Sequence, residues 1–566
     1  MLCDLFTPRG EGLTGTPWTV YPRPQMRRDS FLCLNGQWEF EVAAERPTTY
    51  SKTITVPFCP ESSLSGVKAH FAEGISLWYR RGFSLPEGFH RGRVLLHVGA
   101  ADQNAEVFLN GKRIGKHHGG YEAFTFDLTQ GLKTENELII RCWDNLNDRS
   151  APYGKQVKKR GGMWYTPVSG IWQTVWLESV PQSYIEKLHI ENRGASVTID
   201  IGKDLAGTVR VAGLGTYPLE KGKAVIQPED PHFWSPEDPY LYEFSVETET
   251  DRVESYFALR TLEIQKVGGY PRLCLNGKPY FFHGLLDQGY WPDGLFTPAA
   301  PECYAEDILA VKKLGFNTLR KHIKVEPEEF YYQCDKLGMV VFQDMVNNGS
   351  YSFLRDTALP TVLPAIQSLV DDRKLQNDRA VRNGFLAGMT ATVNQLKNHP
   401  CILYWTIFNE GWGQFDSDRI YEQFLKLDDT RWVDTTSGWF RRKKTHVDSR
   451  HVYFRKIDLK AGDKPLVLSE FGGYACKVEG HIFNTDKEYG YKSMDSLEVL
   501  SEAVERVYRE EVIPAAEKGL CAAIYTQVSD VEDEINGLVT YDRRVEKLTP
   551  EKMLPLAEAL QKAVTV

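Results

Sequence analysis

The first third of the chain alternates apolar and polar residues in short runs that are separated by turn residues. Two of these runs are Gly36–Val42 and Ala105–Lys112, and the second contains Asn-Gly, a dipeptide typical of a tight hairpin turn. A period of two residues predicts half-buried β-strands, and no long helical pattern interrupts them. We therefore predict that residues 1–180 form a β-sandwich of the jelly-roll type.

A shorter series of strand-like runs follows in residues 181–268. Ser196–Ile201 and Leu241–Val246 show the same alternation, again without a helical stretch. A unit of this length built only from short strands is typical of an immunoglobulin-like β-sandwich. We expect this unit to be a separate, smaller sandwich.

The pattern changes after residue 268, where apolar runs alternate with segments of helical periodicity. The eight predicted strands are Tyr280–Leu286, Thr318–Ile323, Met339–Gln343, Ile402–Phe408, Trp432–Ser437, His451–Phe454, Leu466–Leu468 and Leu520–Thr526. Eight strands with helices between most of them predict a (β/α)8 TIM barrel over residues 269–566. Catalytic groups are then expected at the C-terminal ends of the strands.

Size and charge narrow the possible functions. The 566 residues exceed the roughly 250–300 at which a single core stops growing, so several domains are expected. The formal net charge of -9 argues against a nucleic acid or an anionic membrane as the main partner. No run of apolar residues is long enough to predict a membrane span.

The ten cysteines are scattered, with no C-x-x-C pair and no zinc-like Cys/His spacing. We therefore expect reduced thiols, no metal and no other cofactor. The N-terminus shows no basic region followed by an apolar one, so we expect no signal peptide and a cytoplasmic location. Assembly into a homo-oligomer stays open.

Two of the predicted barrel strands end in a glutamate. Ile402–Phe408 is followed by Asn409 and Glu410, and Leu466–Leu468 is followed by Ser469 and then Glu470. The fourth and seventh strands of a barrel face one another, so these carboxyl groups are expected to meet across its axis. Glycoside hydrolysis requires such a pair, and a separation of about 5–5.5 Å gives retention of configuration while a wider gap gives inversion.

These strand ends, the Gly-Ile-Trp sequence at residues 170–172, and the order of sandwich, immunoglobulin-like unit and barrel resemble glycoside hydrolase family 2. That family contains β-galactosidases, β-glucuronidases and β-mannosidases, and the resemblance covers nearly the whole chain. It implies a retaining exo-β-glycosidase with Glu410 as the acid/base and Glu470 as the nucleophile. It also implies that Asn409 hydrogen-bonds the sugar 2-hydroxyl.

The same resemblance suggests three supporting residues. Arg320 is expected to hydrogen-bond the nucleophile and keep it ionised. His322 is a candidate for contact with sugar hydroxyls, although a neutral core histidine explains it nearly as well. Tyr453 is expected to donate to the nucleophile, with an aromatic core residue as the alternative. Further candidate substrate contacts are Trp291, Asp344 and Tyr525.

The identity of the sugar depends on charge. Family β-glucuronidases carry an Asn-x-Lys motif near the end of the barrel, whereas the acidic segment Ser529–Asp542 has none. Arg320, Lys321 and Lys324 form a basic cluster that could accept an acidic sugar, unless the two lysines face a helix or solvent. We predict a galactoside or a galacturonide, and a glucuronide as the second choice.

Two other functions remain open, and each of them would also have a carbohydrate as its partner. One is a non-catalytic carbohydrate-binding protein on a decayed barrel, which the presence of both glutamates and Asn409 disfavours. The other is an endo-acting cellulase, which the two sandwich units disfavour.

Overall fold

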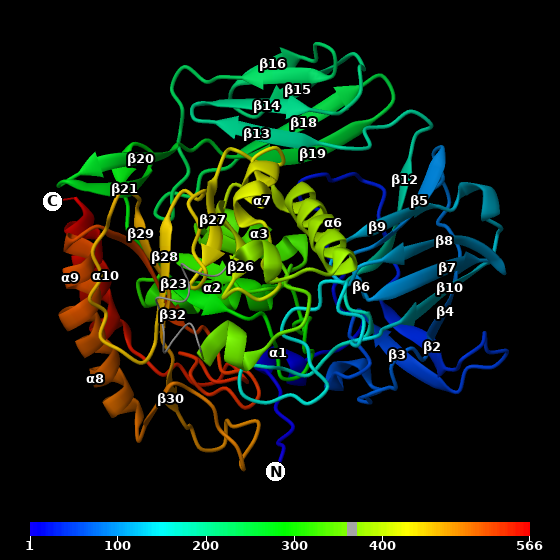
Figure 1. The fold of residues 1–566 in the computed structure, drawn as a ribbon. Helices are drawn as coiled ribbons and strands as arrows, with labels where there is room; N and C mark the ends of the chain where they lie inside the picture. Colours follow the sequence, from blue (N-terminus) through cyan, green and yellow to red (C-terminus); the bar gives the residue numbers. More distant parts are fainter. Residues whose placement is uncertain (359–370, 566) are drawn as a thin grey trace.

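The computed structural model describes residues 1–358 and 371–565, and its three units follow one another along the chain (Figure 1). The first unit is a sandwich of two antiparallel sheets. Its six-stranded sheet contains, in order, β3 (Lys52–Val56), β2 (Gly36–Val42), β4 (Leu77–Phe83), β10 (Asn136–Trp143), β7 (Asn104–Leu109) and β8 (Lys112–His118). Its four-stranded sheet contains β1 (Leu32–Cys33), β12 (Val175–Val180), β5 (Arg93–Val98) and β9 (Phe124–Asp127).

Alternation of side chains explains why these two sheets pack together. In β2 the buried residues Trp38 and Phe40 alternate with the exposed Gln37 and Glu39. The two buried rings meet Leu96 and Leu177 of the other sheet in one core. The predicted hairpin forms between β7 and β8, where Asn110 and Gly111 both have positive φ angles of 50° and 85°. A short helix α1 (Pro8–Glu11) precedes the unit, and β6 (Ala101–Asp102) pairs with β11 (Gly170–Ile171).

The second unit is a smaller sandwich with its own core. One sheet contains β13 (His189–Arg193), β14 (Ser196–Asp200) and β17 (Lys223–Ile226), and the other contains β16 (Gly215–Pro218), β15 (Gly207–Val211), β18 (Tyr242–Thr248) and β19 (Arg252–Phe257). A three-stranded antiparallel sheet leads from it to the barrel. This sheet consists of β20 (Leu262–Val267), β21 (Tyr270–Leu275) and β22 (Lys278–Pro279).

The third unit is an eight-stranded sheet in which all hydrogen-bonded neighbours are parallel. The strands are β27 (Trp432–Ser437), β26 (Ile402–Asn409), β25 (Val340–Asp344), β24 (Thr318–Lys321), β23 (Phe282–Asp287), β32 (Leu520–Thr526), β29 (Leu466–Gly472) and β28 (Asp448–Val452), in this order. The two end strands meet where Ser437 Oγ lies 3.2 Å from Ser449 Oγ, which closes the barrel. β26 and β29 are buried along their whole length, as expected for strands covered on both faces.

Helices pack around this barrel (Figure 1). They are α2 (Glu302–Lys313), α3 (Glu328–Leu337), α6 (Arg379–Leu396), α7 (Ser417–Phe424), α8 (Leu497–Val507), α9 (Ile513–Glu517) and α10 (Pro550–Val564). Shorter elements are the helical turns Ser63–Ser65, Thr129–Gly131, Leu354–Ala358, Asp372–Lys374 and Tyr508–Val512, and the paired strands β30 (Tyr474–Cys476) and β31 (Lys492–Met494). None of the helices in the described part of the chain is both long and apolar enough to cross a membrane.

The predicted fold class is confirmed, with both sandwiches and the barrel in the expected order. The domain limits at residues 180 and 268 stay predictions. The connections over residues 438–447 and 453–465 contain no α-helix, and the sequence analysis predicted helices between most of the strands only. The sequence analysis also did not single out α10, whose internal Pro555 weakens a helical pattern.

Candidate active site

Glu410 and Glu470 lie at the C-terminal ends of β26 and β29, as predicted. Glu410 follows β26 directly with a φ angle of 53°, and Gly411 continues the turn with a φ of 75°. The Glu410 side chain is 16% exposed and that of Glu470 is 6% exposed. One oxygen of each carboxylate and one ring nitrogen of His451 all lie within 4.8 Å of one another. The structure therefore brings the predicted carboxylate pair together.

The Glu470 carboxylate is held by donors on both oxygens. Arg320 Nη1 lies 3.0 Å from Oε1, and the Tyr453 hydroxyl donates to Oε2 over 2.6 Å. Burial by itself would raise the pKa of Glu470, but the neighbouring His451, Arg320 and His322 lower it to about 2. Glu470 is therefore ionised at neutral pH, the form that a nucleophile requires.

Arg320 connects Glu470 to two other predicted residues. Its Nε lies 3.0 Å from Asp344 Oδ1, and its Nη2 donates to Asn409 Oδ1 over 2.8 Å. The second oxygen of Asp344 lies 2.7 Å from His322 Nδ1. Asp344 thus orients Arg320 and His322, and the Asn409 oxygen is occupied so that its amide nitrogen is the group left to donate to a sugar hydroxyl.

The sequence analysis gave no role to His451, which lies between the two glutamates. Its Nδ1 is 2.8 Å from Glu410 Oε1 and 3.5 Å from Glu470 Oε2, while its Nε2 is 3.1 Å from Ser437 Oγ. The signal was present in the sequence, because residues two apart on a strand share a face and His451 precedes Tyr453 by two.

These three residues also form a group whose ligand atoms are close enough for a metal ion. Arg320 and Tyr453 already occupy both oxygens of Glu470, and a guanidinium at 3.0 Å repels a cation. The donor set fits an acid–nucleophile pair better than it fits a metal.

The prediction that Lys321 and Lys324 accept an acidic sugar is wrong. Lys321 Nζ lies 2.7 Å from Asp287 Oδ2 and 4.2 Å from the centre of the Phe330 ring on α3, outside the barrel. Lys324 Nζ lies 2.9 Å from Glu326 Oε2, and both lysines are buried. Strand alternation explains this placement, because Arg320 points into the barrel and its neighbour must point out.

Two predicted aromatic contacts also lie in the core. Trp291 packs edge-on against Tyr304 and beneath the Arg543 guanidinium, which is 4.0 Å from the centre of a Trp291 ring. Tyr525 packs against Phe471 with ring centres 5.4 Å apart. Trp291 and Tyr525 are at most 2% exposed. Among the described residues, neither forms a hydrogen bond with Glu410 or Glu470. The structure thus gives them packing roles.

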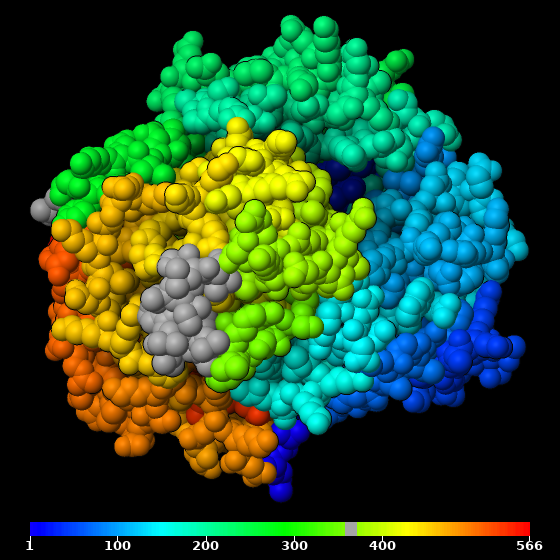
Figure 2. Space-filling model, viewed as in Figure 1, coloured from blue at the N-terminus to red at the C-terminus, as the bar shows by residue number. Residues whose placement is uncertain are grey.

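A segment of the first sandwich, residues 144–169, reaches across to the mouth of the barrel. The Tyr153 hydroxyl donates to the Gly349 carbonyl over 2.7 Å, and the ring of Trp164 packs 5.3 Å from that of Trp412. Trp412 follows Glu410 by two residues. Figure 2 shows this cyan part of the sandwich against the green part of the barrel. The site is therefore built from two units of the chain.

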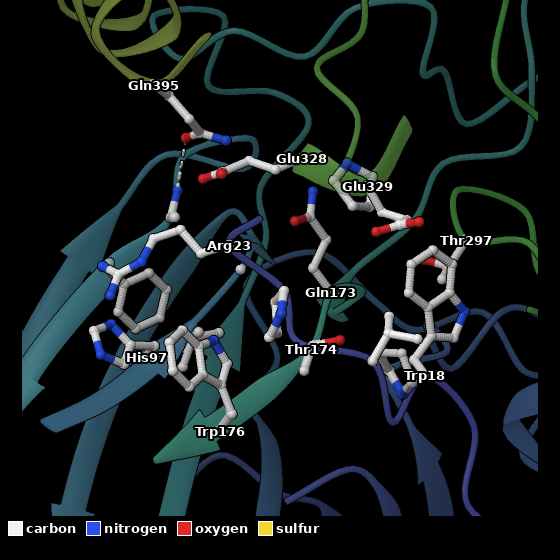
Figure 3. Close-up of a pocket in the computed structure, with 18 of the residues that line it drawn as sticks. Trp18, Arg23, His97, Gln173, Thr174, Trp176, Thr297, Glu328, Glu329 and Gln395 are labelled. Atoms are coloured by element: carbon white, nitrogen blue, oxygen red, sulfur yellow. Dashed lines mark hydrogen bonds between the residues drawn. The ribbon is translucent and has the colours of Figure 1, made fainter. Parts of the chain in front are cut away.

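A separate cavity of about 90 Å³ lies between the four-stranded sheet of the sandwich and the helices α3 and α6 (Figure 3). Arg23 and His97 line it from the sandwich, and Glu328 and Gln395 line it from the helices. Gln395 Oε1 accepts a hydrogen bond from the Ala123 amide over 3.3 Å, which ties the two units together. None of the predicted catalytic residues lines this cavity.

Comparison with known families gives the same assignment for all three units. The model "Glycosyl hydrolases family 2, TIM barrel domain" matches residues 270–546. The model "Glycosyl hydrolase 2 galactose-binding domain-like" matches residues 44–165, and "Glycosyl hydrolases family 2" matches residues 185–260. This chain belongs to glycoside hydrolase family 2. The family is the one that the sequence predicted.

The similar proteins differ in the sugar that their names state. A β-galactosidase from Thermoanaerobacter pseudethanolicus is 25% identical over 74% of this chain and 58% of its own length. A β-glucuronidase from Bacteroides fragilis is 22% identical over 82% of this chain and 70% of its own length. This chain spans between 39% and 70% of the length of the first three curated relatives that it matches.

Solved structures share the fold over nearly the whole chain. A β-glucuronidase from Faecalibacterium prausnitzii has a TM-score of 0.69 at 19% identity and covers 96% of this chain and 99% of its own. A family 2 β-galacturonidase from Eisenbergiella tayi bound to galacturonate has a TM-score of 0.67 at 18% identity, with the same coverage of 96% and 99%. At these identities the likeness concerns the fold.

Proposed function

We propose that this protein is a retaining, exo-acting β-glycosidase that removes a terminal galacto-configured sugar, either a galactoside or a galacturonide. The spacing of the two carboxylates carries the proposal. One oxygen of each carboxylate lies within 4.8 Å of the other, which favours the separation of about 5–5.5 Å of retaining enzymes over the roughly 6.5–9.5 Å of inverting ones.

The geometry supports a double displacement. Ionised Glu470 attacks the anomeric carbon, and Glu410 gives its proton to the departing oxygen, so that the glycosidic bond breaks as the ester bond to Glu470 forms. Glu410 then removes a proton from water, whose oxygen attacks the same carbon and releases Glu470. Arg320 and Tyr453 hold Glu470 in position throughout, with both of its oxygens hydrogen-bonded before reaction.

Exo action is supported by aromatic rings from two units of the chain that pack together near Glu410. Trp164 lies 4.9 Å from Tyr351 and 5.3 Å from Trp412, measured between ring centres. A long polysaccharide requires a cleft that is open on both sides of the catalytic pair, so this arrangement disfavours an endo-acting cellulase. The ordered contacts of Glu470 disfavour a non-catalytic binding protein.

The galacto configuration is supported by the names of two similar proteins, the Thermoanaerobacter β-galactosidase and the Eisenbergiella β-galacturonidase. The second candidate is a β-glucuronide, because several solved neighbours are named as β-glucuronidases. Both candidates use the same catalytic pair and differ in the sugar that it receives.

Trapping the covalent intermediate tests the reaction. A 2,4-dinitrophenyl 2-deoxy-2-fluoro-β-galactoside should label Glu470, as mass spectrometry of the digested protein would show, and Glu470→Gln should stay unlabelled. A label on a different carboxylate would remove Glu470 from the nucleophile role. The first sugar released from a nitrophenyl β-glycoside should be the β-anomer in NMR spectra, whereas release of the α-anomer would mean inversion.

A further inference from the structure

The sandwich segment brings one lysine, Lys155, to the mouth of the barrel. The preceding Gly154 has a φ angle of 62°, and a Cβ there would lie 2.8 Å from the Ile323 carbonyl oxygen at the end of β24. The amides of Tyr153 and Gly154 both donate to the Asn347 carbonyl, beyond the end of β25, over 3.1 and 3.2 Å. The backbone at Lys155 is therefore fixed against the ends of two barrel strands.

The Lys155 ammonium group lies among residues that surround the catalytic pair. It is 5.5 Å from the centre of the Trp164 ring, which packs against Trp412. Burial lowers the pKa of His322, and the charge of Lys155 lowers it further. Burial raises the pKa of Glu534, and Lys155 opposes that rise. Lys155 is thus close enough to His322 and Glu534 for its charge to act on both.

This half-buried cation has no anionic partner in the part of the chain that the structure describes. The oxygens of Glu534, the acid on which it acts, instead accept from the Tyr165 hydroxyl and the Asn536 amide. Residues 359–370, which are not described, contain no Asp or Glu. A cation–π contact at 5.5 Å replaces only a small part of an ion pair. Lys155 therefore differs from Lys321 and Lys324, whose charges are matched by buried carboxylates.

We propose that Lys155 binds the carboxylate of a hexuronic acid, so that the preferred substrate is a galacturonide and not a neutral galactoside. The proposal rests on the proposed glycosidase function and adds the acidic substituent that the site recognises. An ammonium group that is partly removed from water and lacks a counter-charge gains most from a ligand that brings one. The Trp164 ring beside it lowers the local dielectric and strengthens that attraction.

The test is a comparison of acidic and neutral sugars in Lys155→Met. We expect kcat/KM for p-nitrophenyl β-galacturonide to fall about ten- to a hundredfold, the loss of a charge-assisted hydrogen bond, with less than about a threefold change for p-nitrophenyl β-galactoside. Lys155→Arg should keep a preference for the galacturonide. The matched control is Lys159→Met, an exposed lysine of the same segment, which should leave both values unchanged.

The outcomes separate this proposal from the function on which it rests. Equal losses for both sugars, or no loss for either, would overturn the carboxylate role while Glu470 labelling still confirmed the glycosidase. Cleavage of a glucuronide with the same dependence on Lys155 would support the carboxylate role and correct only the configuration at the 4-position. If no glycoside is cleaved and no label appears on Glu470, the proposed function fails and the role of Lys155 falls with it.

Discussion

Two clusters of buried charge lie on opposite faces of β24, one residue apart in the sequence. In the inner cluster, Arg320 contacts Asp344 and Glu470 inside the barrel. In the outer cluster, Lys321 and Lys324 contact Glu326 between the barrel and its helices, and Lys321 also contacts Asp287. The charged side chains of both clusters are almost completely removed from solvent, except that of Asp287, which is 14% exposed.

The difference lies in the balance of charge. The outer cluster has two lysines for two carboxylates, so each charge has a partner within the protein. The inner cluster has one arginine for Asp344 and Glu470, with the carboxyl group of Glu410 and the imidazoles of His322 and His451 nearby. This excess of carboxyl groups suits a transition state that develops positive charge at the anomeric carbon. Both clusters combine basic side chains with carboxylates. They differ in the face of β24 on which they lie and in the balance of positive and negative charge.

The largest expected effect is a loss of activity in Glu410→Ala, a substitution beside the inner cluster that should not disturb the fold. In Glu410→Ala, a methyl glycoside should lose about 10²–10⁴-fold in kcat/KM, because its leaving group needs a proton. A 2,4-dinitrophenyl glycoside should lose far less in the glycosylation step, since its leaving group departs unprotonated. Burst kinetics with both substrates measure this, and an equal loss for both would exclude Glu410 as the acid.

The outer cluster should respond in the opposite way, with lost stability and unchanged chemistry. Glu326 is completely buried, and its oxygens lie 2.8 Å from Lys321 Nζ and 2.9 Å from Lys324 Nζ. Glu326→Gln leaves two buried cations short of a charge and should lower the free energy of unfolding by about 3–5 kcal/mol. Denaturant unfolding followed by tryptophan fluorescence measures this loss.

The matched control for Glu326→Gln is Glu306→Gln, which removes the carboxylate from an exposed pair with Arg9. That change should cost at most about 1 kcal/mol. At a temperature where both variants are folded, kcat/KM should equal that of the unchanged protein. A large fall in kcat/KM for folded Glu326→Gln would mean that the outer cluster takes part in catalysis, and the comparison would break down.

The sequence predicted which side chains reach the site where the pattern of apolar residues showed which face of a strand points inward. Elsewhere it did not. Glu410 and Glu470 follow continuous apolar runs, and both lie where the barrel geometry requires. The alternation that placed Arg320 inside also predicts that Lys321 faces outward, but the net charge of the cluster suggested a uronate site instead. For Lys321, the alternation of side chains along the strand predicts the observed direction, whereas the number of basic residues does not.

Contacts between distant segments could not be predicted from the sequence. Lys155 and Trp164 belong to the first sandwich, and their approach to the barrel depends on how two units pack. No periodicity within residues 144–169 contains that information. The predictions for Trp291 and Tyr525 were wrong for a related reason. An aromatic residue near a strand end can pack in the core or line the site, and its neighbours in space decide between the two.

The smallest of these effects should follow removal of one donor from the inner cluster. Tyr453→Phe deletes the 2.6 Å hydrogen bond to Glu470, which is worth about 1.5–3 kcal/mol for an ionised acceptor. The pKa of Glu470, now lowered to about 2 by charges that outweigh its burial, should rise by about one to two units. Because the nucleophile must be ionised, the acid limb of kcat/KM against pH should move to higher pH.

The same shift has a consequence for stability and supplies the control. A carboxyl group whose pKa is depressed from 4.5 to about 2 stabilises the native state fully above the higher value, and that contribution disappears as the pH falls through the lower one. Tyr453→Phe should therefore lose part of its stability above pH 4.5 relative to the unchanged protein. Tyr508→Phe, a buried tyrosine that packs against Phe471 and contacts His283, should leave the acid limb in place. If the acid limb does not move in Tyr453→Phe either, Arg320 and the two histidines are sufficient to keep the Glu470 carboxyl group ionised.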